Sequence, residues 1–203
     1  MTGTDDIATS GIILAGGRSS RFGSDKLAAH IDGLSLLERS VVGLGSIATE
    51  VVVVVAPGDP RSSVTSEPSV RIVHDPELHG GPLVGLLAGL EAVTEPIALI
   101  AAGDMPSLQL DVLRLLVRTL IGADPAYGAV ILERLGRAEP FPAAVRVGAA
   151  TEQARRLVAD GERRLGALFE LLPTRLIDEG AWRPLDPDSL TLRDIDVPAD
   201  LEP

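Results

Sequence analysis

The organisation of this chain is decided by one stretch near its start, Leu14-Ala15-Gly16-Gly17-Arg18-Ser19-Ser20-Arg21-Phe22-Gly23-Ser24-Asp25-Lys26. It follows the apolar run Gly11-Ile12-Ile13, which is too brief for anything but a buried strand. Two adjacent glycines directly after a strand offer backbone N–H groups with no Cβ in the way. Arg21 and Lys26 add mobile positive charge for the same anion. The stretch therefore predicts a loop that binds phosphate.

This loop differs from two better-known phosphate-binding loops. The loop of many ATPases needs two glycines five apart followed by Lys and Ser or Thr, and the sequence has no such string. The dinucleotide fingerprint needs Gly-x-Gly-x-x-Gly, whereas here the glycines are adjacent and the next one is Gly23. A plain glycine-rich turn with solvated Arg and Lys explains neither the density nor the order of these residues.

Length and composition favour one α/β domain spanning residues 1–203. A chain of 203 residues can bury a core of useful size. Hydrophobic residues make up 45% of the chain but aromatic residues only 2%, so the core must consist of Ala, Val, Leu and Ile. That composition suits buried parallel strands covered by helices.

Charge and cysteine content restrict the classes of partner. A formal net charge of −11 repels nucleic acid and anionic lipid, so we expect no nucleic-acid or membrane partner. A small phosphorylated substrate stays compatible if it is bound locally, by the glycine turn, a few Arg and Lys side chains and a divalent cation. The absence of cysteine excludes disulfides and thiolate ligands. The first residues lack a basic-then-apolar signal, and we expect a cytoplasmic protein.

Strand and helix patterns alternate along the chain. Five consecutive valines at 51–55 are apolar on both faces and indicate a central strand covered on each side. The expected strands are 11–13, 50–56, 70–75, 96–104, 128–132, 142–147 and 174–178, and the expected helices are 35–44, 82–93, 108–120, 151–160 and 163–172. This alternation predicts a three-layer, doubly wound, mostly parallel sheet, whose ligands bind at the carboxyl ends of the strands.

Carboxylates close two of these patterns. Asp104 ends a buried strand just before Pro106, which suits a hard cation such as Mg²⁺ bound through one or two carboxylates and substrate phosphates. An N-cap for the helix near Leu108 is the weaker alternative. Asp194-Ile195-Asp196 would place two carboxylates on one face of a strand, where they could complete the metal site. The histidines show no zinc spacing.

The first loop, written Leu-Ala-Gly-Gly-x-Ser-x-Arg-x-Gly-x-Asp-Lys, resembles the signature of the MobA-like NTP transferases, which include molybdenum cofactor guanylyltransferase. Gly81-Pro82-Leu83-Val84-Gly85 is similar to the family's Gly-Pro-Leu-x-Gly turn. The segment Gly103-Asp104-Met105-Pro106 is similar to its Cys-Asp-x-Pro strand end. The resemblance runs from Ile12 to Leu201 and implies a Rossmann-like nucleotidyltransferase fold.

The resemblance also implies roles for particular residues. The catalytic residues would be Arg21, Lys26 and Asp104, and the resemblance gives Asp104 the role of Mg²⁺ ligand. The spacing of the tail carboxylates, not the resemblance, suggests Asp196 as the second ligand, with Asp194 as the alternative. The nucleotide would be contacted by Leu14, Ala15, Gly16, Gly17, Lys26, Asp75, Gly81, Pro82 and Asp104. Gly161-Glu162-Arg163-Arg164-Leu165 matches a Gly-x-Arg-x-Leu stretch near the family's acceptor, and a solvated helix start explains it equally well.

The activity implied by the resemblance is transfer of GMP from GTP to the phosphate of molybdenum-molybdopterin, with release of pyrophosphate. It also implies transient contact with proteins that handle this cofactor. Asp194-x-Asp196 departs from the Asn-x-Asn-Thr-Pro of guanylyltransferases and is closer to cytidylyltransferases acting on the same pterin. The first loop and Gly81–Gly85 favour GTP over CTP. Three further functions stay open: another NTP:phosphate nucleotidyltransferase, a nucleotide-sensing domain without turnover, and a glycosyltransferase using Asp-x-Asp as its metal motif.

Overall fold

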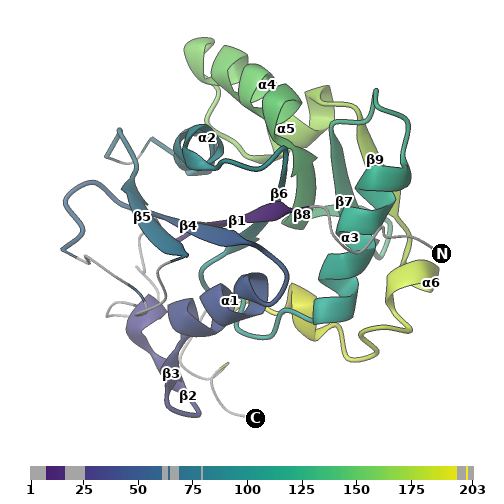
Figure 1. Ribbon diagram of the computed structural model, residues 1–203, viewed down its shortest axis with the longest axis horizontal. Coiled ribbons are helices and arrows are strands. Elements are labelled where there is room, and N and C mark those ends of the chain that lie inside the picture. The colour runs from purple at the N-terminus through teal and green to yellow at the C-terminus, as the bar shows by residue number, and fades with distance from the viewer. Residues whose placement is uncertain are drawn as a thin grey trace.

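A seven-stranded sheet forms the centre of the molecule (Figure 1). The computed structural model describes residues 8–16, 26–60, 64, 69–78, 80–195 and 200. The strands lie in the order β5-β4-β1-β6-β8-β7-β9. Their bounds are β1 Thr9–Leu14, β4 Glu50–Val55, β5 Val70–His74, β6 Ile97–Ala102, β7 Ala129–Arg134, β8 Arg137–Arg146 and β9 Thr174–Ile177. In this sheet β8 runs antiparallel to its neighbours β6 and β7, and the other adjacent pairs are parallel.

The middle of the sheet is β1, which pairs on one side with β4 and on the other with β6. Ile12 lies opposite Val52 of β4 and Ile100 of β6, and all three side chains have no exposed surface. The valine run of β4 is buried on both faces, as its unbroken apolar pattern predicts.

Helices cover both faces of the sheet, so the predicted three layers are confirmed (Figure 1). One face carries α2 Pro82–Ala92, α4 Val147–Ala159 and α5 Gly166–Leu171. The other face carries α1 Leu36–Gly45, α3 Leu110–Gly122 and the short α6 Glu179–Trp182. Nearly all the side chains in both buried layers are aliphatic, and Trp182 is the large exception. Its indole N–H donates to the Glu133 carbonyl at 2.9 Å, which satisfies its one polar atom.

The smaller elements connect these layers. They are the 3₁₀ turn η1 Lys26–Ala28, the hairpin strands β2 His30–Ile31 and β3 Leu34–Ser35, and the 3₁₀ turn η2 Leu190–Leu192. The hairpin leads into α1 through a capping box, in which Glu38 N donates to the Ser35 hydroxyl at 3.2 Å and Ser35 N donates to the Glu38 carboxylate at 2.7 Å. Among the described residues, no helix is long and apolar enough to cross a membrane.

Several boundaries differ from the sequence expectation, and the tail differs in kind. The predicted strand at 142–147 is instead β8, which begins at Arg137 because it forms a hairpin with β7. The helix expected from Arg163 begins at Gly166, because Arg163 instead packs against the start of α2, where its carbonyl accepts a hydrogen bond from Leu83 N. The strand expected around Asp194–Asp196 is wrong for the described part of the tail. After η2, residues 193–195 have no regular secondary structure.

Candidate active site

The carboxyl ends of four parallel strands meet at one rim of the sheet. Backbone hydrogen bonds continue past the strands: Ala15 N donates to Val54 O at 2.8 Å, and Gly103 N donates to Leu14 O at 3.0 Å. Asp75 N donates to Val55 O at 2.8 Å. The turns that follow β1, β5 and β6 are therefore held side by side. Gly16, Asp75 and Asp104 all lie at this rim, the end of a parallel sheet at which ligands bind.

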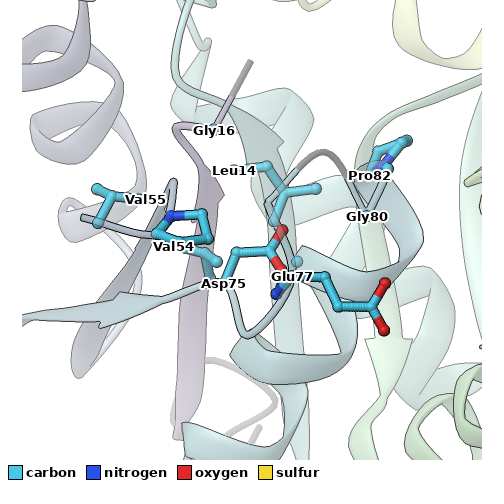
Figure 2. Close-up of a pocket in the computed structure, with 11 residues that line it drawn as sticks. Leu14, Gly16, Val54, Val55, Asp75, Glu77, Gly80 and Pro82 are labelled. Atoms are coloured by element: carbon cyan, nitrogen blue, oxygen red, sulfur yellow. Dashed lines mark hydrogen bonds between the residues drawn. The ribbon is translucent and has the colours of Figure 1, made fainter. Parts of the chain in front are cut away.

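A pocket of about 270 Å³ opens at this rim (Figure 2). In Figure 2, Asp75 lies between the ends of β1 and β4 on one side and the start of α2 on the other. The walls are mostly aliphatic side chains and glycine backbone, with two carboxylates as their charged groups. The lining residues are Leu14, Gly16, Val54, Val55, Pro57, Asp75, Glu77, Gly80, Gly81, Pro82 and Gly85. The structure thus brings together five of the sequence-predicted nucleotide contacts: Leu14, Gly16, Asp75, Gly81 and Pro82.

Close packing explains the glycines at the start of α2. Gly81 precedes the helix with a φ of +88°, which favours glycine, and Pro82 occupies the first helical position. A Cβ at Gly85 would lie 3.2 Å from the Asp75 Oδ2, so a bare backbone is needed beside that carboxylate. The expectation that Gly85 and Gly89 permit close approach is confirmed, since a Cβ at Gly89 would lie 2.7 Å from the Cγ2 of Ile12.

The environment of the pocket changes the pKa of Asp75. Burial raises the pKa of Asp75, the nearby Glu77 carboxylate also raises it, and the backbone N–H of Glu77 opposes both by donating to Asp75 Oδ1 at 2.9 Å. Withdrawal from water together with a like charge favours the neutral acid. Hydrogen bonds donated by a ligand to the Asp75 carboxylate would lower this pKa again and stabilise the charged form.

Asp104 forms an ion pair with Lys26. The Lys26 Nζ lies 2.8 Å from Asp104 Oδ2, and the two side chains are 11% and 24% exposed. Within the part of the chain that the structure describes, the buried Asp104 Oδ1 accepts no hydrogen bond. A buried acceptor without a partner is costly and points to an absent ligand. The alternative of a helix cap is wrong, because the N-cap of α3 is Gln109.

The C-terminal tail lies beside Asp104. Ile195 is buried, and its N–H donates to the Asp104 carbonyl at 3.2 Å, whereas Asp194 is exposed. The predicted residues Gly17, Arg21 and Asp196 lie outside the described residues. Among the residues described, no group of three or more His, Asp or Glu side chains could hold a metal ion. Of the two tail carboxylates, Asp194 is turned to solvent, and Asp104 is the acid at this rim with a buried, available oxygen.

The residues 161–164 contact the start of α2. Leu83 N donates to the carbonyl of Arg163 at 3.2 Å, and the Arg163 guanidinium lies 3.5 Å from Glu77. Arg164 instead pairs with Glu162 at 2.8 Å and is 68% exposed. Sequence reasoning missed Val54, Val55, Pro57, Glu77 and Gly80 as pocket residues. The signal for the first three was available, since they end or follow the valine strand whose carboxyl end must lie at this rim.

The fold and this rim define an α/β protein with a mostly parallel sheet and a pocket at the carboxyl ends of its strands. The structure is similar to that of molybdopterin-guanine dinucleotide biosynthesis protein A from Archaeoglobus fulgidus, with a TM-score of 0.77 and 23% sequence identity. The similarity covers 95% of this chain and 94% of the other, and at that identity it shows the fold alone.

The family follows from the sequence comparisons. The profile of the MobA-like NTP transferase domain matches residues 11–176, and the chain belongs to this family. It is 34% identical over 202 residues to a probable molybdenum cofactor guanylyltransferase from Chloroflexus aggregans, covering 95% of this chain and 91% of the relative. It is 33% identical to another from Mycobacterium marinum, covering 98% and 94%. The resemblance seen in the sequence is therefore confirmed.

Proposed function

We propose that this protein transfers GMP from GTP to the phosphate of molybdenum-molybdopterin and releases pyrophosphate. The relatives named above carry the name of that activity. The observation that carries the proposal is the pairing, on one rim, of a pocket containing two carboxylates with the Lys26–Asp104 pair. The pocket would take the base, and the pair would lie toward the phosphates.

The charged groups of the pocket support guanine as the base. Guanine presents its N1–H and its 2-amino group as adjacent donors, and an ionised carboxylate only accepts hydrogen bonds. Asp75 and Glu77 therefore complement guanine. Cytosine has one amino donor beside two acceptors, and those acceptors would face carboxylate oxygens. A mismatch that leaves buried polar groups unpaired is what rejects the wrong base.

The residues at Asp104 fit Mg²⁺. This ion binds proteins through one or two carboxylates and completes its shell with water and substrate phosphates, so a single well-placed acid is sufficient. The unpartnered Oδ1 of Asp104 is an available oxygen ligand, and we propose Asp196 as a second one. Bound Mg²⁺ would neutralise charge on the phosphates of the nucleotide.

Residues of the protein would supply the rest of catalysis, which is the alignment of the reacting groups and the stabilisation of their charge. An acceptor phosphate oxygen attacks the α-phosphorus, the bond from that phosphorus to the bridging oxygen of the β-phosphate breaks, and pyrophosphate leaves with the electron pair. The attacking phosphate is ionised at neutral pH because its second pKa is about 6, so no strong general base is required. Lys26, Arg21 and the amides of Gly16 and Gly17 would align the triphosphate and stabilise its charge.

The domain organisation, cellular location, substrates and partners are part of the same proposal. We take residues 1–203 as one nucleotidyltransferase domain acting in the cytoplasm, with GTP and the molybdopterin cofactor as small-molecule substrates. Transient contact with cofactor-handling proteins would deliver the acceptor and remove the product.

The test is pyrophosphate release with molybdopterin, Mg²⁺ and each NTP in turn. We expect kcat/KM for GTP to exceed that for CTP by at least about tenfold, the value of about 1.4 kcal/mol of discrimination. Asp104→Asn is the matched inactive control. A ratio that favours CTP would replace guanylyl with cytidylyl transfer, the function favoured by Asp194-x-Asp196. No pyrophosphate with any NTP would contradict transferase activity.

A further inference from the structure

A turn from a distant part of the chain supports the start of α2. This turn, residues 161–164, connects α4 with α5 and is called the 161–164 turn below. The Arg163 carbonyl accepts a hydrogen bond from Leu83 N at 3.2 Å. A Cβ at Gly81 would lie 2.9 Å from the Arg163 Cβ and 3.0 Å from its carbonyl oxygen. Gly81 lines the pocket, so the 161–164 turn packs directly behind the pocket wall.

The guanidinium of Arg163 is held by backbone carbonyls of α4 and of the 161–164 turn itself. Its Nη1 donates to the carbonyls of Val158, in the last turn of α4, and Glu162, both at 3.0 Å. Its Nη2 lies 3.5 Å from the Oε2 of Glu77. Because the two carbonyls hold Nη1, the plane of the guanidinium is set and its Nη2 lies on the side of a neighbouring carboxylate. That carboxylate is Glu77.

Glu77 in turn contacts Asp75, the carboxylate that we propose binds the base. Its backbone N–H donates to Asp75 Oδ1 at 2.9 Å, and its side chain lies across Gly80, where an added Cβ would be 2.7 Å from the Glu77 Cβ. Two carboxylates two residues apart repel each other, and the Glu77 charge contributes to the raised pKa of Asp75. The cation facing Glu77 from the 161–164 turn is Arg163.

We propose that Arg163 is a positioning residue of the nucleotide pocket, acting through Glu77 and the Gly81 turn. It holds the Glu77 side chain away from Asp75, offsets its charge in the pocket that would take the base, and fixes the start of α2. This inference rests on the proposed function in one respect, that the pocket takes a nucleotide. It assigns Arg163 to the nucleotide side of the site, whereas the family resemblance places this stretch near the acceptor.

The test is a double-mutant cycle between Arg163→Met and Glu77→Gln, read by equilibrium binding of a fluorescent GTP analogue without acceptor. Arg163→Met keeps the aliphatic stem and removes the guanidinium. We expect it to weaken binding about fivefold and to raise KM for GTP, with kcat within about twofold, the scale of a partly exposed ion pair. In the Glu77→Gln background the same change should cost less than about twofold.

Two further variants distinguish a positioning role of Arg163 from a purely structural role in the fold. Arg163→Lys should recover only part of the affinity, because an ammonium cannot span two carbonyls and a carboxylate as the guanidinium does. Arg156→Met is the matched control, since Arg156 is an exposed arginine of α4 paired with Glu152 of the same helix. It should leave binding unchanged. If Arg163→Met fails to fold, Arg163→Lys replaces it in the cycle.

An equal loss of affinity in both backgrounds would show that Arg163 acts without Glu77 and would overturn the inference. Unchanged binding in Arg163→Met would overturn it too, while the proposed function would stand. Failure of the unaltered protein to bind any NTP would overturn the proposed function and this inference together.

Discussion

Replacing Lys26 by methionine tests the arrangement at the rim most directly. The change removes the ammonium that lies 2.8 Å from Asp104 Oδ2 and keeps a side chain of similar length. Asp104 Oδ1 already lacks a partner among the described residues, so the variant leaves a largely buried carboxylate without this cation on either oxygen.

The free energy of unfolding that Lys26→Met should lose lies between two limits. Exposed ion pairs contribute about 0–1 kcal/mol, whereas breaking a fully buried pair costs about 3–5 kcal/mol. With side chains 11% and 24% exposed, this pair lies between them, and we expect a loss of about 2 kcal/mol. For a chain of this size, that loss lowers Tm by about 4–8 °C.

The assay is thermal unfolding of the wild type, Lys26→Met and the double variant Lys26→Met/Asp104→Asn, with and without Mg²⁺. We expect Mg²⁺ to raise the Tm of Lys26→Met more than that of the wild type, because the cation then meets a carboxylate with no ammonium competing for it. The double variant should respond least. Equal Mg²⁺ shifts in all three proteins, or a wild-type Tm for Lys26→Met, would refute the reasoning.

Three other predictions concern the packing of α2 on the core, the pH dependence of stability at the amino end of β4, and the rate of pyrophosphate release. Gly89→Ala should destabilise the protein by about 1–2 kcal/mol in urea unfolding despite its better helix propensity, because its methyl group would lie 2.7 Å from Ile12 Cγ2; a neutral result would show that α2 can shift. Burial alone would raise the pKa of Glu50, but hydrogen bonds, led by that from Arg71, lower it to about 2 from 4.5. Stability should therefore be lost as pH falls from about 4.5 toward 2, and Glu50→Gln should flatten that part of the pH profile. Asp104→Asn should lower kcat for pyrophosphate release by at least about 100-fold, and full activity at ordinary Mg²⁺ would remove Asp104 from the mechanism.

The sequence determined the layers and the rim because both depend on local patterns. Five β-branched valines at 51–55 indicate a strand buried on both faces, and the short apolar runs of β1 and β6 indicate the same. Parallel strands place their carboxyl ends together, so Gly16, Asp75 and Asp104 could be assigned to one site before any contact was known. The motif around Asp104 likewise identified the acid that the structure pairs with Lys26.

The sequence already indicated that Asp194–Asp196 lies at the site, but only the tertiary structure decided the backbone path of that tail and the contacts of the other distant segments. The reversal of β8, the irregular tail beside Asp104 and the packing of Arg163 behind Gly81 all join residues far apart in the chain. No periodicity or spacing encodes such contacts, because they depend on how the helices settle on the sheet. Glu77 illustrates the reason: it reads as an ordinary loop acid in sequence, whereas in the structure it lines the pocket and faces Arg163, which lies 86 residues further along the chain.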